Sequence, residues 1–144
     1  MNFFCFISYT DSYVNYKTHK IYVVTEKGKV LSSAHNQVIC LCDPTAHAEI
    51  LSIREAASKV QNYRLLNTTL YVTVEPCIMC MGAIIHARIS TVVFGAFDPK
   101  WGAAGSLYNF ADDTRLNHQL EIAPGICEDE CKALMQDFFR SKRN

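Results

Sequence analysis

The 144-residue sequence lacks any long apolar run. Its longest, residues 78–85, is eight residues, against the roughly 20 that a membrane-spanning helix needs. The sequence also lacks an excess of charge of one sign, since 14 basic and 14 acidic residues cancel. Any contact with nucleic acid must therefore come from a local patch of charge. The first residues have neither a basic segment nor a small-residue cleavage site, so we expect no secretory leader and no membrane anchor.

Cysteine is too sparse for a disulfide scaffold, because the seven cysteines are an odd number and fall below the roughly 8 to 10% typical of such proteins. Reduced thiols are typical of the cytoplasm, where they are available to bind metal. Apolar residues make up 49% and charged residues 19% of the chain, a balance that favours a packed core over disorder. The length predicts one domain, residues 1–144.

Hydrophobic periodicity predicts strands that alternate with helices. Asp43 and Pro44 are typical of a helix start, as the N-cap and the first helical position. A strand, a helix and a second strand in close succession predict a parallel crossover, and the long segment 98–117 is expected to be functional. The predicted strands are 21–25, 30–36, 68–74, 91–95 and 119–123, and the predicted helices are 43–62, 77–87 and 127–143.

A metal-binding constellation opens the first two predicted helices. His47 and Glu49 form an H-x-E pattern, and Cys77 and Cys80 form a P-C-x-x-C pattern. The two cysteines are three residues apart, so they share one helix face, and the helix N-terminus favours thiolates. One histidine and two thiolates form a zinc set that leaves the fourth position for water. Glu49 is then placed to move the protons of that water.

A plainer interpretation is open for each of these residues alone, because buried cysteines often act as small hydrophobic side chains. A histidine at a helix start commonly contacts only backbone. The joint pattern outweighs this interpretation, since H-x-E followed by P-C-x-x-C is the signature of zinc-dependent nucleobase deaminases.

The sequence resembles the tRNA adenosine deaminases of the bacterial TadA type from about residue 23 to residue 143. The zinc pattern alone indicates only the deaminase superfamily. A glycine-rich loop, a Leu-Asn-His triplet and a Phe-Phe-Arg tail narrow the resemblance to this branch. The matching segments are 34–36, 43–49, 71–77, 80–84, 102–107, 116–118 and 137–140.

The resemblance implies an α/β protein with the three-layer α/β/α cytidine deaminase-like fold and a mixed sheet of about five strands. It also implies hydrolysis of adenosine to inosine at the wobble position, 34, of a tRNA anticodon loop, with release of ammonia. Zn²⁺ would be held by His47, Cys77 and Cys80. Glu49 would take the proton from water, so that hydroxide adds at C6 of the base, and would return protons to N1 and the leaving amine.

The resemblance further implies a set of substrate contacts. Asn36 and the Ala48 backbone would bind the base, and a carboxylate such as Asp98 could accept a hydrogen bond from a ribose hydroxyl. The expected tRNA contacts also include Lys100, Phe138, Phe139 and Arg140, with Trp101, Lys142 and Arg143 as further candidates. Plainer roles remain open for all of these: solvated loop charges, core packing, or complementing the helix dipole. The family also implies a homodimer.

Residues 1–20 depart from the family, which usually begins with an amphipathic helix and a glycine- and proline-containing turn. Two other functions remain open. A free-base or nucleotide deaminase of the guanine, cytidine or dCMP type would share the zinc pattern without a tRNA surface. A non-catalytic RNA-binding partner subunit would keep zinc for structure alone, although the presence of Glu49 argues against it.

Overall fold

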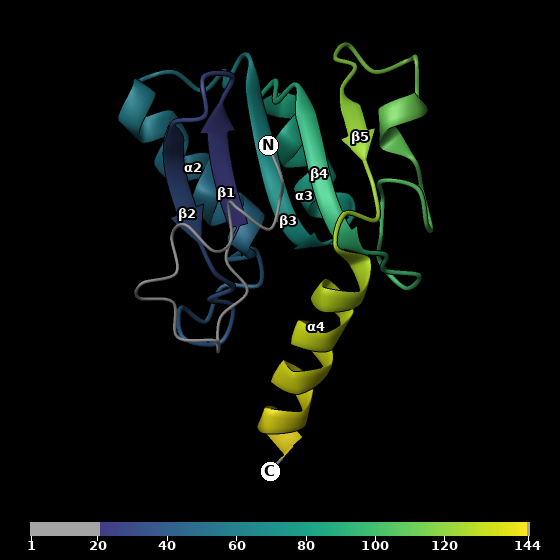
Figure 1. The fold of residues 1–144 in the computed structure, drawn as a ribbon. Helices are drawn as coiled ribbons and strands as arrows, with labels where there is room; N and C mark the ends of the chain where they lie inside the picture. Colours follow the sequence, from purple (N-terminus) through teal and green to yellow (C-terminus); the bar gives the residue numbers. More distant parts are fainter. Residues whose placement is uncertain (1–20, 144) are drawn as a thin grey trace.

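A computed structural model of the chain describes residues 21–143, so the expectations for residues 1–20 lie outside the described residues. Strands and helices alternate along most of this length, as Figure 1 shows. The strands are β1 (Ile21–Thr25), β2 (Val30–Ala34), β3 (Thr68–Val74), β4 (Thr91–Ala96) and β5 (Glu121–Ala123). The helices are α2 (Ala48–Val60), α3 (Ile78–His86) and α4 (Glu128–Arg143), with a short 3₁₀ helix at Phe110–Asp112.

The five strands form one mixed sheet in the order β2-β1-β3-β4-β5. Strand β1 is antiparallel to both β2 and β3, whereas β3, β4 and β5 run parallel. The predicted parallel crossover and mixed five-stranded sheet are therefore confirmed. Because β3 and β4 are parallel neighbours, their carboxyl ends meet at the same end of the sheet.

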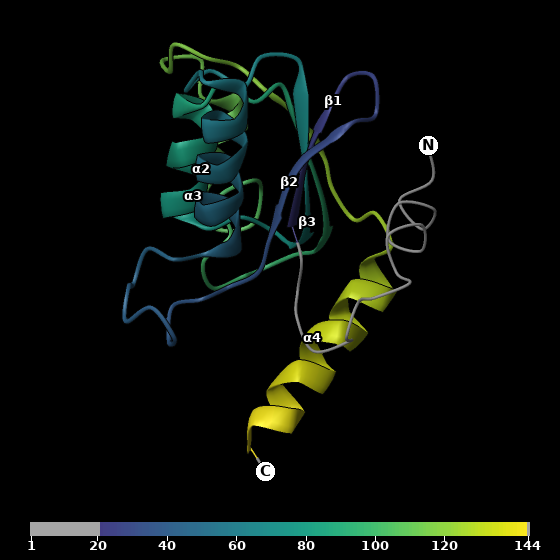
Figure 2. The ribbon, with the colours of Figure 1, turned by 90° about the vertical axis from the view of Figure 1, so that its left-hand side faces the viewer.

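Helices cover both faces of the sheet (Figure 2): α2 and α3 lie on one side and α4 on the other. The main core lies between the sheet and the α2–α3 layer. There, Leu70 and Phe94 of the sheet share one buried cluster with Ile53 of α2 and Ile84 of α3. This three-layer arrangement agrees with the predicted α/β/α fold.

The opposite face of the sheet contacts α4 through Cys131, which is buried against Ala96, Tyr71 and Val93. Gly95 makes this contact possible, since a Cβ there would overlap the Cys131 sulfur and lie 2.7 Å from its Cβ. Cys131 is thus a packing residue. Beyond this contact, α4 extends past the end of the sheet (Figures 1 and 2).

Two predicted helix starts are wrong. Helix α2 begins at Ala48 with His47 as its N-cap, five residues after the predicted start at Asp43. The Asp43 carboxylate accepts hydrogen bonds from the Thr45 amide at 2.8 Å and the Thr45 hydroxyl at 2.7 Å, so it closes a turn ahead of the helix. Helix α3 likewise begins at Ile78, with Cys77 as its N-cap.

Other boundaries shift by a few residues. Strand β5 begins at Glu121, two residues after its predicted start, and α4 begins at Glu128. Among residues 21–143, no helix is both long and apolar enough to cross a membrane.

Candidate metal centre and active site

The candidate centre lies where two helix N-termini meet the carboxyl ends of β3 and β4. His47 is the N-cap of α2, Cys77 is the N-cap of α3, and Cys80 lies in the first turn of α3. Ligand sites in α/β sheets commonly lie beyond the carboxyl ends of parallel strands. The adjacent starts of α2 and α3 therefore bring together residues that are 30 positions apart in the sequence.

The three side chains converge closely. His47 Nδ1 lies 3.7 Å from Cys77 Sγ and 3.6 Å from Cys80 Sγ, and all three ligand atoms lie within 4.8 Å of one another. Cys80 is fully buried, while His47 and Cys77 are half-buried. Within residues 21–143, this is the one group of three or more histidine, cysteine or acidic side chains close enough to hold a metal ion.

The two cysteines differ in acidity. A hydrogen bond between them lowers the pKa of Cys77 to about 5 despite its partial burial, and the same bond together with burial raises the pKa of Cys80. The lowered pKa favours the thiolate of Cys77 at neutral pH, and the thiolate is the form that binds metal. One imidazole and two sulfur donors at this spacing fit zinc, and three protein ligands are typical of an open, catalytic site.

Glu49 follows His47 on α2 and lies beside the cluster. Its side chain is buried, and burial raises the pKa of the carboxyl, with the nearby charge of Cys77 adding to the shift. A hydrogen bond with Cys80 is a smaller influence. A buried carboxyl with a raised pKa takes up a proton more readily than an exposed one, which suits proton transfer.

The residues predicted to bind the base lie close to the cluster in the chain. Asn36 follows β2, and its side-chain oxygen accepts a hydrogen bond from the Val38 amide at 3.1 Å. The next residue, Gln37, donates its amide to the Ala46 carbonyl at 3.0 Å, which ties this segment to the residue before His47. Ala48 is buried as the first residue of α2.

Asp98 and Lys100 lie in the segment that follows β4. Asp98 Oδ1 accepts hydrogen bonds from the backbone amides of Lys100 at 3.0 Å and Trp101 at 3.2 Å. One carboxylate oxygen of Asp98 thus shapes its own turn. Lys100 is exposed, and Trp101 is 64% exposed.

The aromatic and basic residues of the tail lie near the far end of α4. The rings of Phe138 and Phe139 are 5.6 Å apart between centroids in an edge-to-face arrangement. Phe138 is half-buried, Phe139 is exposed, and Arg140 lies 3.6 Å from Asp137 in an exposed ion pair. Helix α4 lies on the face of the sheet opposite α2 and α3, the helices that carry the cluster (Figure 2).

Glu75, directly after β3, is a buried carboxylate that the sequence patterns did not single out. It is 3% exposed and accepts hydrogen bonds from three backbone amides and one hydroxyl of the segment 98–106. Its position in the Glu-Pro-Cys motif, at the carboxyl end of a buried strand, was the signal that could have found it.

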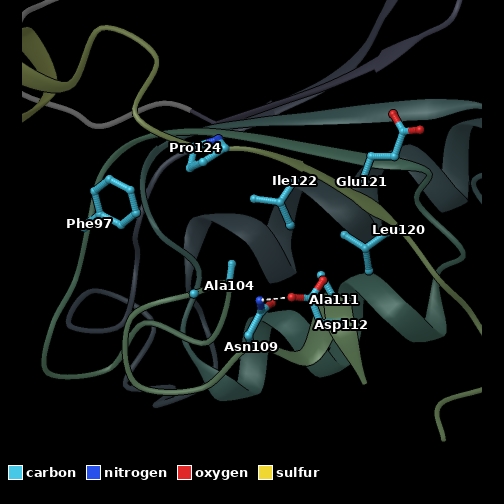
Figure 3. A pocket seen from close by; sticks show the side chains of 10 residues that line it. Phe97, Ala104, Asn109, Ala111, Asp112, Leu120, Glu121, Ile122 and Pro124 are labelled. Atoms are coloured by element: carbon cyan, nitrogen blue, oxygen red, sulfur yellow. Dashed lines mark hydrogen bonds between the residues drawn. The ribbon is translucent and has the colours of Figure 1, made fainter. Parts of the chain in front are cut away.

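A hollow of about 590 Å³ lies beside β5. Ala104 and Gly105 line it together with Leu120 and Ile122, and Asn109 Nδ2 donates a 2.7 Å hydrogen bond to Asp112 Oδ2 within it (Figure 3). None of the three cluster residues lines it. The hollow is thus separate from the metal centre.

The fold and the His/Cys cluster together define a deaminase with the cytidine deaminase-like fold. The family model of MafB19-like deaminases matches residues 11–143. A tRNA-specific adenosine deaminase of Haemophilus influenzae is 49% identical over 121 residues, covering 84% of this chain and 70% of that protein. The chain belongs to the family of tRNA-specific adenosine deaminases.

Solved structures agree with this assignment. One, from biochemical and structural studies of A-to-I editing by tRNA:A34 deaminases, is 38% identical with a TM-score of 0.76, and the match covers 80% of this chain and 83% of that one. A guanine deaminase from Nitrosomonas europaea has a TM-score of 0.70 at 23% identity. The match covers 83% of this chain and 71% of that one. This second likeness concerns the fold alone.

Proposed function

We propose that the chain is a zinc-dependent hydrolase that converts adenosine to inosine at the wobble position of a tRNA anticodon loop and releases ammonia. The observation that carries the proposal is the buried carboxyl of Glu49 beside the His47, Cys77 and Cys80 cluster, in a chain 49% identical to a tRNA-specific adenosine deaminase. An open metal site next to a proton-carrying carboxyl suits hydrolytic deamination.

In this proposal His47, Cys77 and Cys80 hold the zinc ion, which supplies a Lewis acid that makes water nucleophilic at neutral pH. Glu49 takes a proton from the attacking water as its oxygen bonds to C6 of adenine. Glu49 would pass this proton to N1. It would then take the remaining proton from the C6 hydroxyl and give it to the departing amine, so that the C6–N bond breaks as the C6 carbonyl forms and ammonia leaves. The raised pKa of Glu49 supports this role, because the carboxyl must hold a proton between the two transfers.

The base would be held by the Asn36 side chain and the Ala48 backbone. Their places support this assignment, since Asn36 precedes a segment that hydrogen-bonds to Ala46 and Ala48 opens the helix that carries Glu49. An unstacked base of a loop can enter such a site, whereas a base within a duplex cannot. We therefore expect loop RNA as the substrate.

The flanking nucleotides would meet two regions. Asp98 and Lys100 lie in the segment tied to Glu75 next to Cys77, and Phe138, Phe139 and Arg140 lie on the part of α4 that extends past the sheet. Exposed aromatic rings stack on bases and cations contact phosphates. A homodimer would bring a second copy near this surface, and we expect a cytoplasmic protein because tRNA is its substrate.

Mass spectrometry of nucleosides from tRNA incubated with the zinc-loaded protein tests the proposal. We expect inosine to appear at position 34 in tRNA that carries adenosine there. Ammonia release from guanine, cytidine or dCMP without inosine formation would favour a small-molecule deaminase. Zinc binding and RNA binding without any deamination would favour a non-catalytic partner subunit. Sedimentation of the same sample tests the homodimer.

A further inference from the structure

The Glu75 carboxylate is the centre of a buried hydrogen-bond network. Its Oε1 accepts from the amides of Ala104 at 3.0 Å and Ser106 at 2.9 Å. Its Oε2 accepts from the Asp98 amide at 3.0 Å and from the Ser106 hydroxyl. Burying a carboxylate costs free energy unless it is well hydrogen-bonded, and this one has four donors. Its position is therefore strongly determined.

These donors come from both ends of one segment, residues 98–106, which we call the 98–106 loop. The first donor is Asp98 and the last is Ser106, so the loop closes around one carboxylate. Gly102, in the middle of the loop, also lies against Glu75, since a Cβ on Gly102 would overlap the Glu75 carboxyl group. The loop therefore contacts the Glu75 side chain at both ends and at its middle.

The same loop is joined to the metal centre through the backbone. Ala103 donates its amide to the Pro76 carbonyl at 2.9 Å, and Gly102 pairs with Cys77 in an isolated antiparallel bridge. Glu75 precedes these two partners in the chain, and its own amide donates to Ala96 at the end of β4 at 2.8 Å. Glu75 thus links β3, β4, the Cys77 segment and the 98–106 loop.

The network requires a carboxylate. All four donors point at the two oxygens, and an amide in place of the carboxyl would turn an N–H₂ group toward N–H groups. Hydrogen bonds to a charged acceptor are also about twice as strong as neutral ones. Replacing Glu75 by glutamine would therefore release part of the loop with little change in side-chain volume.

We propose that Glu75 is a positioning residue that sets the 98–106 loop, and with it Asp98, Lys100 and Trp101, at a fixed place relative to the metal centre for contact with the nucleotides beside the target base. The proposal rests on the proposed function. Glu75 is not among the residues proposed to hold the base or the metal. Its loss should weaken the productive binding of RNA more than it slows the reaction of bound RNA.

The test compares Glu75→Gln with the wild-type zinc-loaded protein, using an anticodon stem-loop RNA with adenosine at the wobble position. We expect KM to rise at least about tenfold, kcat to change less than about threefold, and one zinc per chain to remain. Glu121→Gln is the matched control, because this glutamate is exposed on β5, and it should leave both constants unchanged. A merely structural role would lower the active fraction, and hence kcat alone, which would overturn the proposal.

A second readout is independent of activity. Hydrogen exchange of the Asp98, Ala104 and Ser106 amides should be at least about ten times faster in Glu75→Gln than in the wild type, with unchanged exchange in α2. Unchanged exchange of the three loop amides would overturn the proposal. If the wild-type protein made no inosine, the proposed function would fail, while the exchange experiment would still decide whether Glu75 holds the loop.

A milder pair of variants serves if Glu75→Gln does not fold. Ser106→Ala removes one donor at an exposed position, and Ser106→Thr retains the hydroxyl. We expect Ser106→Ala to raise KM about threefold and Ser106→Thr to restore it. Equal KM values for the two variants and the wild type would overturn the proposal.

Discussion

The metal centre and the tail of α4 are built in opposite ways. His47, Cys77 and Cys80 are held by two helix starts and a buried β3–β4 edge, whereas Phe139 and Arg140 lie exposed on a helix that extends past the sheet. Buried groups are held in place before substrate arrives, while exposed side chains must be ordered on binding. The first region is therefore suited to chemistry and the second to affinity.

The largest expected effect is on the metal ligands. Replacing Cys80 by serine removes a fully buried thiol from the cluster, and even the partners of metal ligands contribute about 10- to 100-fold to affinity. We expect Cys80→Ser to lower zinc affinity by more than about 100-fold and to abolish turnover. Metal analysis after dialysis measures this. Cys40→Ser, at an exposed loop cysteine, should keep one zinc per chain, and full zinc in both variants would disprove the ligand assignment.

The next effect separates chemistry from binding. Glu49→Gln should keep zinc and RNA affinity but lower kcat at least about 100-fold, which is the usual size of general acid–base catalysis. Single-turnover assays with saturating enzyme measure this loss. Glu55→Gln on the exposed face of the same helix, where Glu55 pairs with Lys59, should turn over normally. Wild-type turnover by Glu49→Gln would rule out the proton-transfer role.

The attachment of α4 to the sheet can be tested through two glycines. Gly95→Ala places a Cβ against Cys131, and we expect it to lower the free energy of unfolding by about 1 to 3 kcal/mol. Gly82→Ala in α3 meets open space and should raise it by about 0.5 to 1 kcal/mol. Urea unfolding at one fixed zinc concentration measures both changes. The same sign for both variants would contradict the packing described for α4.

The smallest expected effect concerns the tail cations. Arg140→Gln should weaken binding of the anticodon stem-loop and reduce the slope of log K against log salt by about 1, as for one lost phosphate contact. Zinc content and kcat should not change. Arg64→Gln is the control, because its guanidinium lies over the Tyr63 ring beyond the opposite end of α2. Equal slopes for both variants and the wild type would show that Arg140 does not contact phosphate.

The sequence predicted the sheet well for two reasons. Apolar and polar residues alternate along its strands, and a strand, helix and strand in close succession almost always form a parallel crossover of one hand. The metal cluster was also predictable, since H-x-E and P-C-x-x-C are short patterns whose residue types suggest their chemistry. Convergence of the three side chains follows from two helix starts at one end of a βαβ unit. Their proximity in the structure agrees with that expectation.

The start of α2 was less predictable. Asp43 followed by Pro44 is typical of a helix start, yet the Asp43 carboxylate closes a separate turn with Thr45. Glu75 was missed for a different reason. Its burial depends on the 98–106 loop, whose Asp98 and Ser106 donate to it from 23 and 31 residues further along the chain. Single-sequence patterns do not reveal such long-range contacts.

The placement of the metal cluster on two separate helices also bears on folding. Cys77 follows His47 by 30 positions, so an ion bound to both closes a ring of chain that contains α2 and β3. The unfolded chain has no such preformed site, and the ion therefore favours the native state by mass action. Each tenfold rise in free zinc above its dissociation constant would add about 1.4 kcal/mol to the free energy of unfolding.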